Sequence, residues 1–113
     1  MRHLKLIVDN KEKNENIFFN KYELKIILNL YAKMVSLGDW KDYGLSISKK
    51  EISFNVYPRA SEFPVYKITK NLNPKNENDK YLIKNSQNIT LNKSKNLDNL
   101  IKKIVWKKFK LVN

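Results

Sequence analysis

The sequence predicts an α+β fold in which an N-terminal helix, an antiparallel sheet of three to five strands and a C-terminal helix share one core. Two observations lead to this prediction. Apolar residues recur at a helical spacing near both ends of the chain, and the segments between them alternate apolar with polar residues, as strands do. The segments follow one another through short polar connections, which favours a meander. We expect one domain over residues 17–113, since a chain of 113 residues suffices for a single modest core.

Residues 1–16 are predicted to form a flexible leader. Most of this segment is polar and shows no period that would let it bury one face. Leu4–Val8 alternates weakly between apolar and polar character, so an edge strand there is the alternative.

The first helix is expected to begin after Asn20 and to end at Gly38. Asn20 and Glu23 have the spacing of a capping box, in which each side chain bonds the backbone amide of the other residue. Gly38 suits the left-handed position that closes a helix. The predicted apolar stripe between them consists of Leu24, Ile27, Leu28, Tyr31, Met34 and Val35.

Two strands, at residues 43–48 and 52–57, are predicted to form a hairpin. Each alternates apolar with polar residues, and Lys49–Lys50 between them has the length of a two-residue turn. This turn fixes a register that places four apolar side chains on one face of the sheet. The expected cross-strand pairs are Ile47 with Ile52 and Leu45 with Phe54.

A third strand, Pro64–Lys70, is expected to direct Tyr66 and Ile68 to the same face. A polar loop at 71–80 then leads to a weaker hairpin, with strands at 81–84 and 89–91. The last helix is expected to start near Ser94 or Asn96. Its apolar positions are Leu97, Leu100, Ile101, Ile104, Val105 and Phe109.

The composition excludes several kinds of site. The chain has no cysteine, so disulfides, thiolate nucleophiles and cysteine zinc ligands are absent, and His3 is the only histidine. We therefore predict no metal site and no cofactor. No apolar run approaches the ~18 residues of a membrane span, and the chain does not open on a signal-peptide pattern. The expected location is the cytoplasm.

The formal net charge of +12 has two interpretations. Lysines that neutralise phosphates give salt-dependent binding to nucleic acid, so the charge favours a face that binds an anionic partner. All of the 23 basic residues except Arg2 and Arg59 are lysine, however, whereas clamping phosphates and reading bases favour arginine. The abundance of lysine, asparagine and isoleucine also fits the codon usage of an AT-rich genome. Both interpretations stay open.

Two carboxylates, Asp39 and Asp42, follow the first helix three residues apart. They are candidates for acid–base chemistry or for holding a hard cation. Alternatively they bond the amides of the turn or pair with Arg59, while Trp40 fills the core between helix and sheet.

The loop between Pro58 and Pro64 is a candidate partner-binding site. It carries Arg59, Ser61 and Glu62. Prolines stiffen such a loop, and Arg59 suits a phosphate or carboxylate, with Ser61 donating beside it and Glu62 orienting the guanidinium. The alternative is an ion pair from Arg59 to Glu62 or Asp42 that fixes the loop. Ser61 is a poor nucleophile, because no histidine is at hand to activate it.

A third candidate surface lies near the C-terminus. Trp106 falls off the apolar stripe of the last helix and stands among lysines, so it suits stacking, a partner contact or a membrane surface; covering the rim of the core is the alternative. The basic candidates beside it are Lys102, Lys103 and Lys107. On the sheet, Tyr57 points away from the apolar face, together with Ser53 and Asn55.

A family resemblance covers about residues 18–104 and is strongest up to Lys70. The sequence resembles a family of small alphaproteobacterial proteins known only as a domain of unknown function, although Pro58 stands where relatives carry a first basic residue. The resemblance implies a cytoplasmic single-domain protein and implies no activity. The segments that carry it include Phe19-Asn20-Lys21-Tyr22-Glu23-Leu24, Gly38-Asp39-Trp40-Lys41-Asp42-Tyr43, Arg59-Ala60-Ser61-Glu62 and Tyr66-Lys67-Ile68.

Together these features predict a non-enzymatic binding module whose partner is RNA or an acidic protein. The basic C-terminal helix would speed association, and the Arg59 loop would supply specificity. The alternative is an adaptor or homo-oligomer that works without nucleic acid, through Trp106 and an exposed sheet edge. The third hypothesis is an enzyme or binder that holds a small anionic ligand with Arg59.

Overall fold

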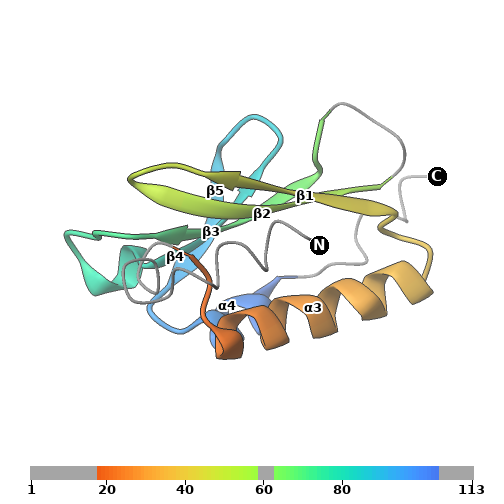
Figure 1. The fold of residues 1–113 in the computed structure, drawn as a ribbon, viewed down its shortest axis with the longest axis horizontal. Coiled ribbons are helices and arrows are strands. Elements are labelled where there is room, and N and C mark those ends of the chain that lie inside the picture. The colour runs from red at the N-terminus through yellow and green to blue at the C-terminus, as the bar shows by residue number, and fades with distance from the viewer. Residues whose placement is uncertain (1–17, 59–62, 105–113) are drawn as a thin grey trace.

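Two helices cover one face of a five-stranded antiparallel sheet (Figure 1). The structure is a computed structural model that describes residues 18–58 and 63–104. The strands lie in chain order, so the sheet is a meander, and the predicted α+β fold is confirmed. Neither α-helix of the described part is long and apolar enough to cross a membrane. The elements are α3 (Lys21–Ser36), β1 (Asp42–Ile47), β2 (Glu51–Tyr57), β3 (Tyr66–Asn71), η1 (Glu77–Asp79), β4 (Tyr81–Asn85), β5 (Thr90–Ser94) and α4 (Leu97–Lys103).

Both predicted ends of helix α3 are confirmed. The Asn20 side chain accepts from the Glu23 amide at 2.8 Å, and the Asn20 amide donates to Glu23 Oε1 at 2.7 Å. At the other end Gly38 has φ +81° and donates its amide to the Val35 carbonyl at 3.0 Å. A residue with a Cβ would be strained at this φ, so glycine ends the helix here.

The buried side of α3 differs in part from the predicted stripe. Ile27 and Met34 are buried as expected, but Leu30 is buried too and Val35 is 40% exposed. Two overlapping stripes satisfy the same helical spacing in this leucine-rich segment, and the sheet selects the one that contains Leu30. The same side carries the charged residue Glu23, which is 1% exposed.

The first hairpin has the predicted turn and register. Ser48 and Glu51 are bonded across Lys49–Lys50, and the observed pairs include Leu45 with Phe54 and Ile47 with Ile52. Ile47 nevertheless remains 48% exposed, because it lies at the end of the edge strand β1. The third strand begins at Tyr66, two residues later than expected, and continues the register by pairing Tyr66 with Val56 and Ile68 with Phe54.

The C-terminal third corrects two predicted boundaries. Strand β5 spans Thr90–Ser94, where 89–91 was expected. Helix α4 is capped by Asn96 but ends at Lys103, with Ile104 already in extended backbone (ψ 135°). The prediction of Ile104 as a helical position was therefore wrong, since a residue just after a helix can pack on the core and continue its apolar spacing. The further predicted positions, Val105 and Phe109, lie outside the described residues. The predicted polar loop at 71–80 contains the short helix η1.

The core lies between the sheet and the helices. Trp40 is 2% exposed and contacts the rings of Tyr31 and Tyr66, so its predicted place between helix and sheet is confirmed. Phe54 on β2 is 1% exposed and stacks on Tyr43 of β1, with ring centroids 4.7 Å apart. This packing leaves the opposite face of the sheet uncovered by either helix (Figure 1).

Candidate functional site

Several predicted site residues lie outside the described part of the chain. These are Arg59, Ser61 and Glu62 of the loop after β2, together with Trp106 and Lys107 near the C-terminus. The anion clamp and the tryptophan contact therefore stay predictions. The flexible leader, residues 1–16, also falls outside the described residues.

Asp39 and Asp42 occupy different surroundings. Asp39 is 4% exposed in the turn that follows α3, whereas Asp42 is exposed at the start of β1 and accepts from the Tyr43 amide at 2.8 Å. Burial and the charge of Asp42 raise the pKa of both Tyr31 and Tyr43. Within residues 18–58 and 63–104, no three Asp, Glu or His side chains lie close enough to hold a metal ion.

Lys102 and Lys103 are exposed on the last turn of α4, as the basic character of that turn predicts. Lys102 Nζ lies 3.4 Å from Asp98 Oδ2, one turn earlier. An exposed pair at this spacing contributes little to stability. Both lysines belong to the helical side of the molecule, opposite the uncovered sheet face (Figure 1).

A buried polar cluster, which the sequence did not suggest, joins α3 to the sheet. Glu23 Oε1 accepts from Lys70 Nζ at 2.9 Å, and Glu23 Oε2 accepts from the Tyr81 hydroxyl. Lys70 Nζ also donates to the Phe18 carbonyl at 3.0 Å. Because Lys70 is 7% and Tyr81 7% exposed, these bonds are shielded from water. The cluster fixes the helix on the sheet and offers no open position to a ligand.

The buried cluster should lower the stability of the protein at alkaline pH. Burial raises the pKa of Tyr81, and the hydrogen bond to Glu23 and the charge of Glu23 raise it further. An unfolded tyrosine titrates near pH ~10, so the contribution of the neutral hydroxyl is complete below about pH 10 and is lost as pH rises beyond it. We expect the free energy of unfolding to fall above that pH, and Tyr81→Phe to reduce this fall.

Urea unfolding of both proteins between about pH 9 and about pH 11 measures the two slopes. Tyr81→Phe should also be less stable at neutral pH by about 1–3 kcal/mol, because Glu23 loses a donor. Equal slopes in the two proteins would argue against this assignment.

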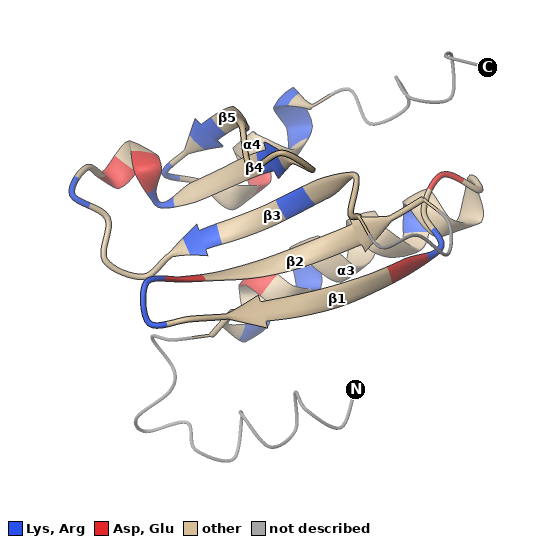
Figure 2. Ribbon diagram, turned by 90° about the horizontal axis from the view of Figure 1, so that it is seen from above, with Lys and Arg blue, Asp and Glu red and all other residues tan. Residues whose placement is uncertain are grey.

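The outer face of the sheet is the side that points away from α3 and α4, and Figure 2 looks down on it. It is polar, whereas the alternate residues of the same strands form the core. We define it by its members on the first four strands: Asp42, Gly44, Ser46, Glu51, Ser53, Asn55, Tyr57, Lys67, Thr69, Asn71, Leu82 and Lys84.

The middle of the outer face is a closed hydrogen-bond network. Ser53 Oγ donates to Asn55 Oδ1 at 2.7 Å and lies 3.3 Å from Thr69 Oγ1. Asn55 Nδ2 donates to Ser46 Oγ at 3.0 Å. Ser53, Asn55 and Thr69 are buried, so these small, hydrogen-bonded side chains form a fixed floor for the face.

Two lysines stand directly opposite each other on this floor. Lys67 on β3 pairs with Lys84 on β4. Lys67 Nζ donates to Asn88 Oδ1 at 2.7 Å, and Lys84 Nζ lies 3.5 Å from Glu51 Oε1 at the other end of the sheet. Their ammonium groups thus point apart along the strands. Like charges directly opposite each other cost stability, and the contacts with Asn88 and Glu51 keep these two ammonium groups apart.

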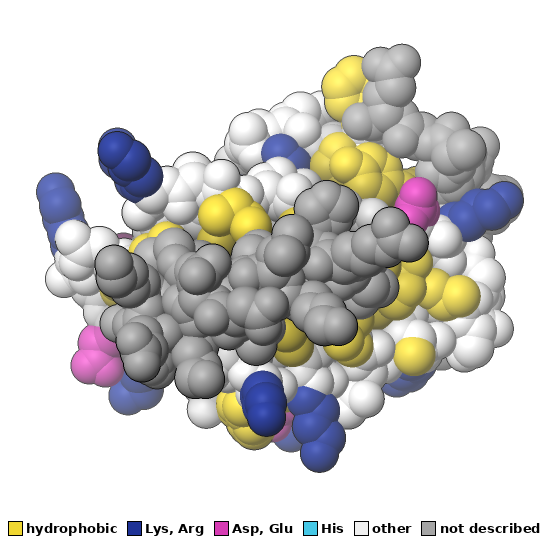
Figure 3. Space-filling model, viewed as in Figure 1, with side chains coloured by type: hydrophobic (Ala, Val, Ile, Leu, Met, Phe, Trp, Pro, Cys, Tyr) yellow, Lys and Arg dark blue, Asp and Glu magenta, His cyan; other side chains and the backbone are white. Residues whose placement is uncertain are grey.

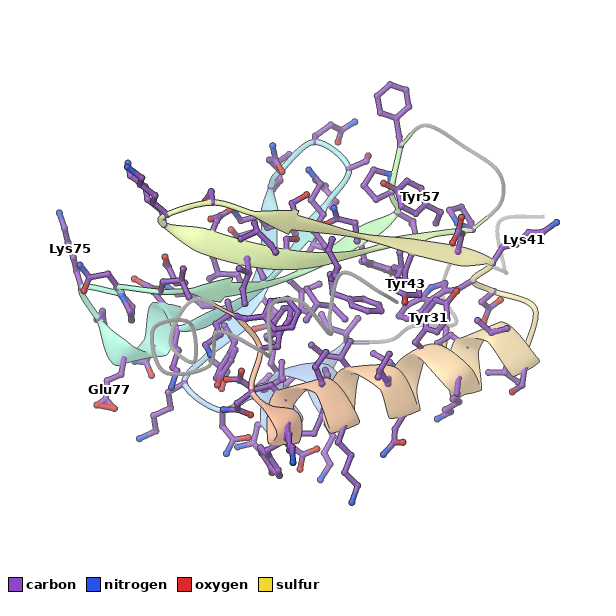
Figure 4. All side chains as sticks on the ribbon, in the orientation of Figure 1. Tyr31, Lys41, Tyr43, Tyr57, Lys75 and Glu77 are labelled. Carbon is purple, nitrogen blue, oxygen red and sulfur yellow. The ribbon has the colours of Figure 1, made fainter. Side chains whose placement is uncertain are left out.

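Tyr57 lies at one end of the same face. A Cβ built on Gly44 of the neighbouring strand would lie 3.8 Å from both Tyr57 Cε1 and Tyr57 Oη, so the ring covers the glycine. Figure 4 shows Tyr57 above the sheet and Tyr31 and Tyr43 below it. The outer face thus combines one half-buried aromatic ring with two lysines and with two carboxylates at its ends, Asp42 and Glu51.

Sequence reasoning noticed Tyr57, Ser53 and Asn55 but missed the lysine pair. The usable signal was the alternation in 66–70 and 81–84, which puts Lys67 and Lys84 on the polar side of their strands. Their adjacency also depends on the β3–β4 register, which a ten-residue loop does not fix.

These features define a class: a small α+β protein with helices on one side of a sheet and an open, polar, lysine-bearing face on the other. Residues 17–101 match the model of the family described as "Protein of unknown function (DUF2794)". The chain belongs to this family, which confirms the resemblance noted in the sequence. No curated protein and no solved structure matches the chain significantly.

Proposed function

We propose that this protein is a non-enzymatic, cytoplasmic RNA-binding module that contacts RNA through the outer face of its sheet. The observation that supports the proposal is the Lys67–Lys84 pair on a face that neither helix covers. An RNA backbone that crosses this face would offer phosphate to both ammonium groups. The net charge of +12 adds long-range attraction for the same partner.

Net charge alone is a weaker argument than the position of the pair. The side view in Figure 3 shows lysine side chains projecting from several parts of the molecule. Lys25 and Lys33, for example, are exposed on α3, away from the outer face. The proposal therefore predicts that lysines on the outer face matter for binding and that those on α3 do not.

RNA binding tests this directly. Fluorescence anisotropy with a labelled oligoribonucleotide would compare the whole protein with Lys67→Gln/Lys84→Gln and with the matched control Lys25→Gln/Lys33→Gln. We expect the first variant to bind about tenfold more weakly or worse, and its dependence on salt between about 50 and about 200 mM to be shallower. The control removes the same charge from the other side of the molecule and should bind nearly as the wild type does.

Two outcomes would contradict the proposal. Equal losses in both variants would mean that only the total charge matters. Binding to polyglutamate without binding to RNA would identify an acidic protein as the partner class instead. Urea unfolding of all three proteins shows whether a loss of binding reflects a loss of folding.

A further inference from the structure

We propose that Tyr57 is the stacking platform for one base of a single-stranded RNA; this inference rests on the proposed function and names the form of RNA that the outer face takes. Its basis is the ring's position over Gly44, on the same face as the lysine pair. An aromatic ring on a sheet surface, with cationic side chains beside it, is the arrangement that binds unpaired bases.

The absent side chain at Gly44 shapes this platform. Tyr57 pairs across the hairpin with Asp42, and its ring extends over the next outer-face position, where Gly44 leaves room for it. Ring atoms 3.8 Å from the ideal Cβ position are at ordinary contact distance, so the ring rests on the strand. A ring supported on one side presents its opposite side to a base at little further ordering cost.

Among the described tyrosines, Tyr57 alone belongs to the outer face. Tyr31, Tyr43 and Tyr66 take part in the aromatic packing of the core, and Tyr81 bonds Glu23. Tyr22 is 65% exposed, but it lies on the first turn of α3. Tyr22 is therefore a matched control: an accessible tyrosine on the far side of the molecule.

Lys67 is the outer-face lysine whose backbone lies nearer to Tyr57. Tyr57 follows Asn55 by two residues on β2, and Asn55 pairs with Lys67. This diagonal relation puts Tyr57 and Lys67 about 7–8 Å apart at the backbone. The Tyr57 ring leans over Gly44 on β1, whereas Lys67 Nζ reaches Asn88 beyond β4. A strand with one base on Tyr57 would therefore run across β2 and β3 and bring the phosphate of a following nucleotide to Lys67.

Because the side chains of the floor bond one another, we expect RNA binding to depend little on base sequence. Ser53, Asn55 and Ser46 bond one another. Base edges then find few unused partners there, whereas every base has a face that stacks. In a duplex the bases are already stacked within the helix, so a single strand should bind more tightly than a duplex of the same length.

The experiment compares the wild type with Tyr57→Phe, Tyr57→Leu and Tyr22→Leu, using single-stranded and duplex RNA of one length in the anisotropy assay. We expect Tyr57→Phe to retain binding and Tyr57→Leu to lose roughly five- to 100-fold for the single strand. The salt dependence of Tyr57→Leu should stay that of the wild type, because its phosphate contacts remain. Tyr22→Leu should not alter binding.

A second measurement, made on the wild type, distinguishes the loss of stacking in Tyr57→Leu from a folding defect. Adding single-stranded RNA to the wild type should shift the NMR signals of the Tyr57 ring protons upfield, as a stacked base requires. No shift, unchanged affinity in Tyr57→Leu, or tighter binding of the duplex would each overturn the inference. If Lys67→Gln/Lys84→Gln weakens binding and Tyr57→Leu does not, this inference fails while the proposed function stands.

Discussion

Replacing Glu23 by alanine should destabilise the protein by about 3–5 kcal/mol, because the change leaves Lys70 buried without its carboxylate. Glu23 accepts from Lys70, from the Tyr81 hydroxyl and from the Asn20 amide, so the substitution also removes half of the capping box. A loss of this size approaches the whole stability of a small domain. Urea unfolding at neutral pH measures it through the midpoint.

Two further variants distinguish the loss of the buried cluster from the loss of a negative charge at an exposed position. Glu77→Gln removes a carboxylate from exposed η1 and should change stability little. The triple variant Glu23→Leu/Lys70→Met/Tyr81→Phe replaces all three polar groups by apolar ones of similar size. It should recover much of the loss, since a well-packed apolar set often matches a buried ion pair. If Glu23→Ala proves no worse than Glu77→Gln, the cluster does not hold α3 on the sheet.

Replacing Phe54 by alanine should cost about 3–5 kcal/mol by opening a cavity between the sheet and α3. Phe54 is 1% exposed, stacks on Tyr43 and meets the ring of Tyr31 at 5.8 Å. The matched control is Phe63→Ala, which removes the same side chain at a position that is 69% exposed. We expect that control to lie within about 0.5 kcal/mol of the wild type.

Denaturant midpoints of both phenylalanine variants, and of Phe54→Leu as a milder change, give the comparison. Phe54→Leu should fall between the wild type and Phe54→Ala, because leucine refills part of the cavity. Similar losses from Phe54→Ala and Phe63→Ala would mean that Phe54 is not part of the core between the sheet and α3.

The parts of the fold that sequence could predict are those set by local signals. The capping box at Asn20 and the glycine stop at Gly38 each depend on a few neighbouring residues, and both are present. The first hairpin was predictable because a two-residue turn and the apolar alternation point to the same register. Trp40 could likewise be assigned to the core from its place between the helix and the strands.

The parts that sequence could not predict depend on contacts distant along the chain. Lys70 and Glu23 are 47 residues apart, and nothing local marks either of them as buried. Lys67 and Lys84 meet only through the β3–β4 register. The end of α4 at Lys103 also escaped prediction, because the apolar spacing continues past the point where the backbone becomes extended.

The sequence and the structure indicate different surfaces for the partner. Sequence reasoning suggested RNA binding and placed the contacts on Arg59 and on the last helix, whereas the described residues direct the proposal to the outer face of the sheet, on the side away from α4. Arg59 follows Tyr57 by two residues in the sequence and lies outside the described residues. The two hypotheses concern separate residues and are tested by separate variants.

The measurement that tests the central claim most directly is NMR mapping of a single-stranded RNA onto the whole protein. The account predicts that backbone and side-chain signals of β1 to β4 on the outer face, those of Tyr57, Lys67 and Lys84 foremost, shift on titration. Signals of the exposed side of α3, around Lys25 and Lys33, should stay in place. Shifts confined to α3 or α4, with the outer face unchanged, would contradict the account.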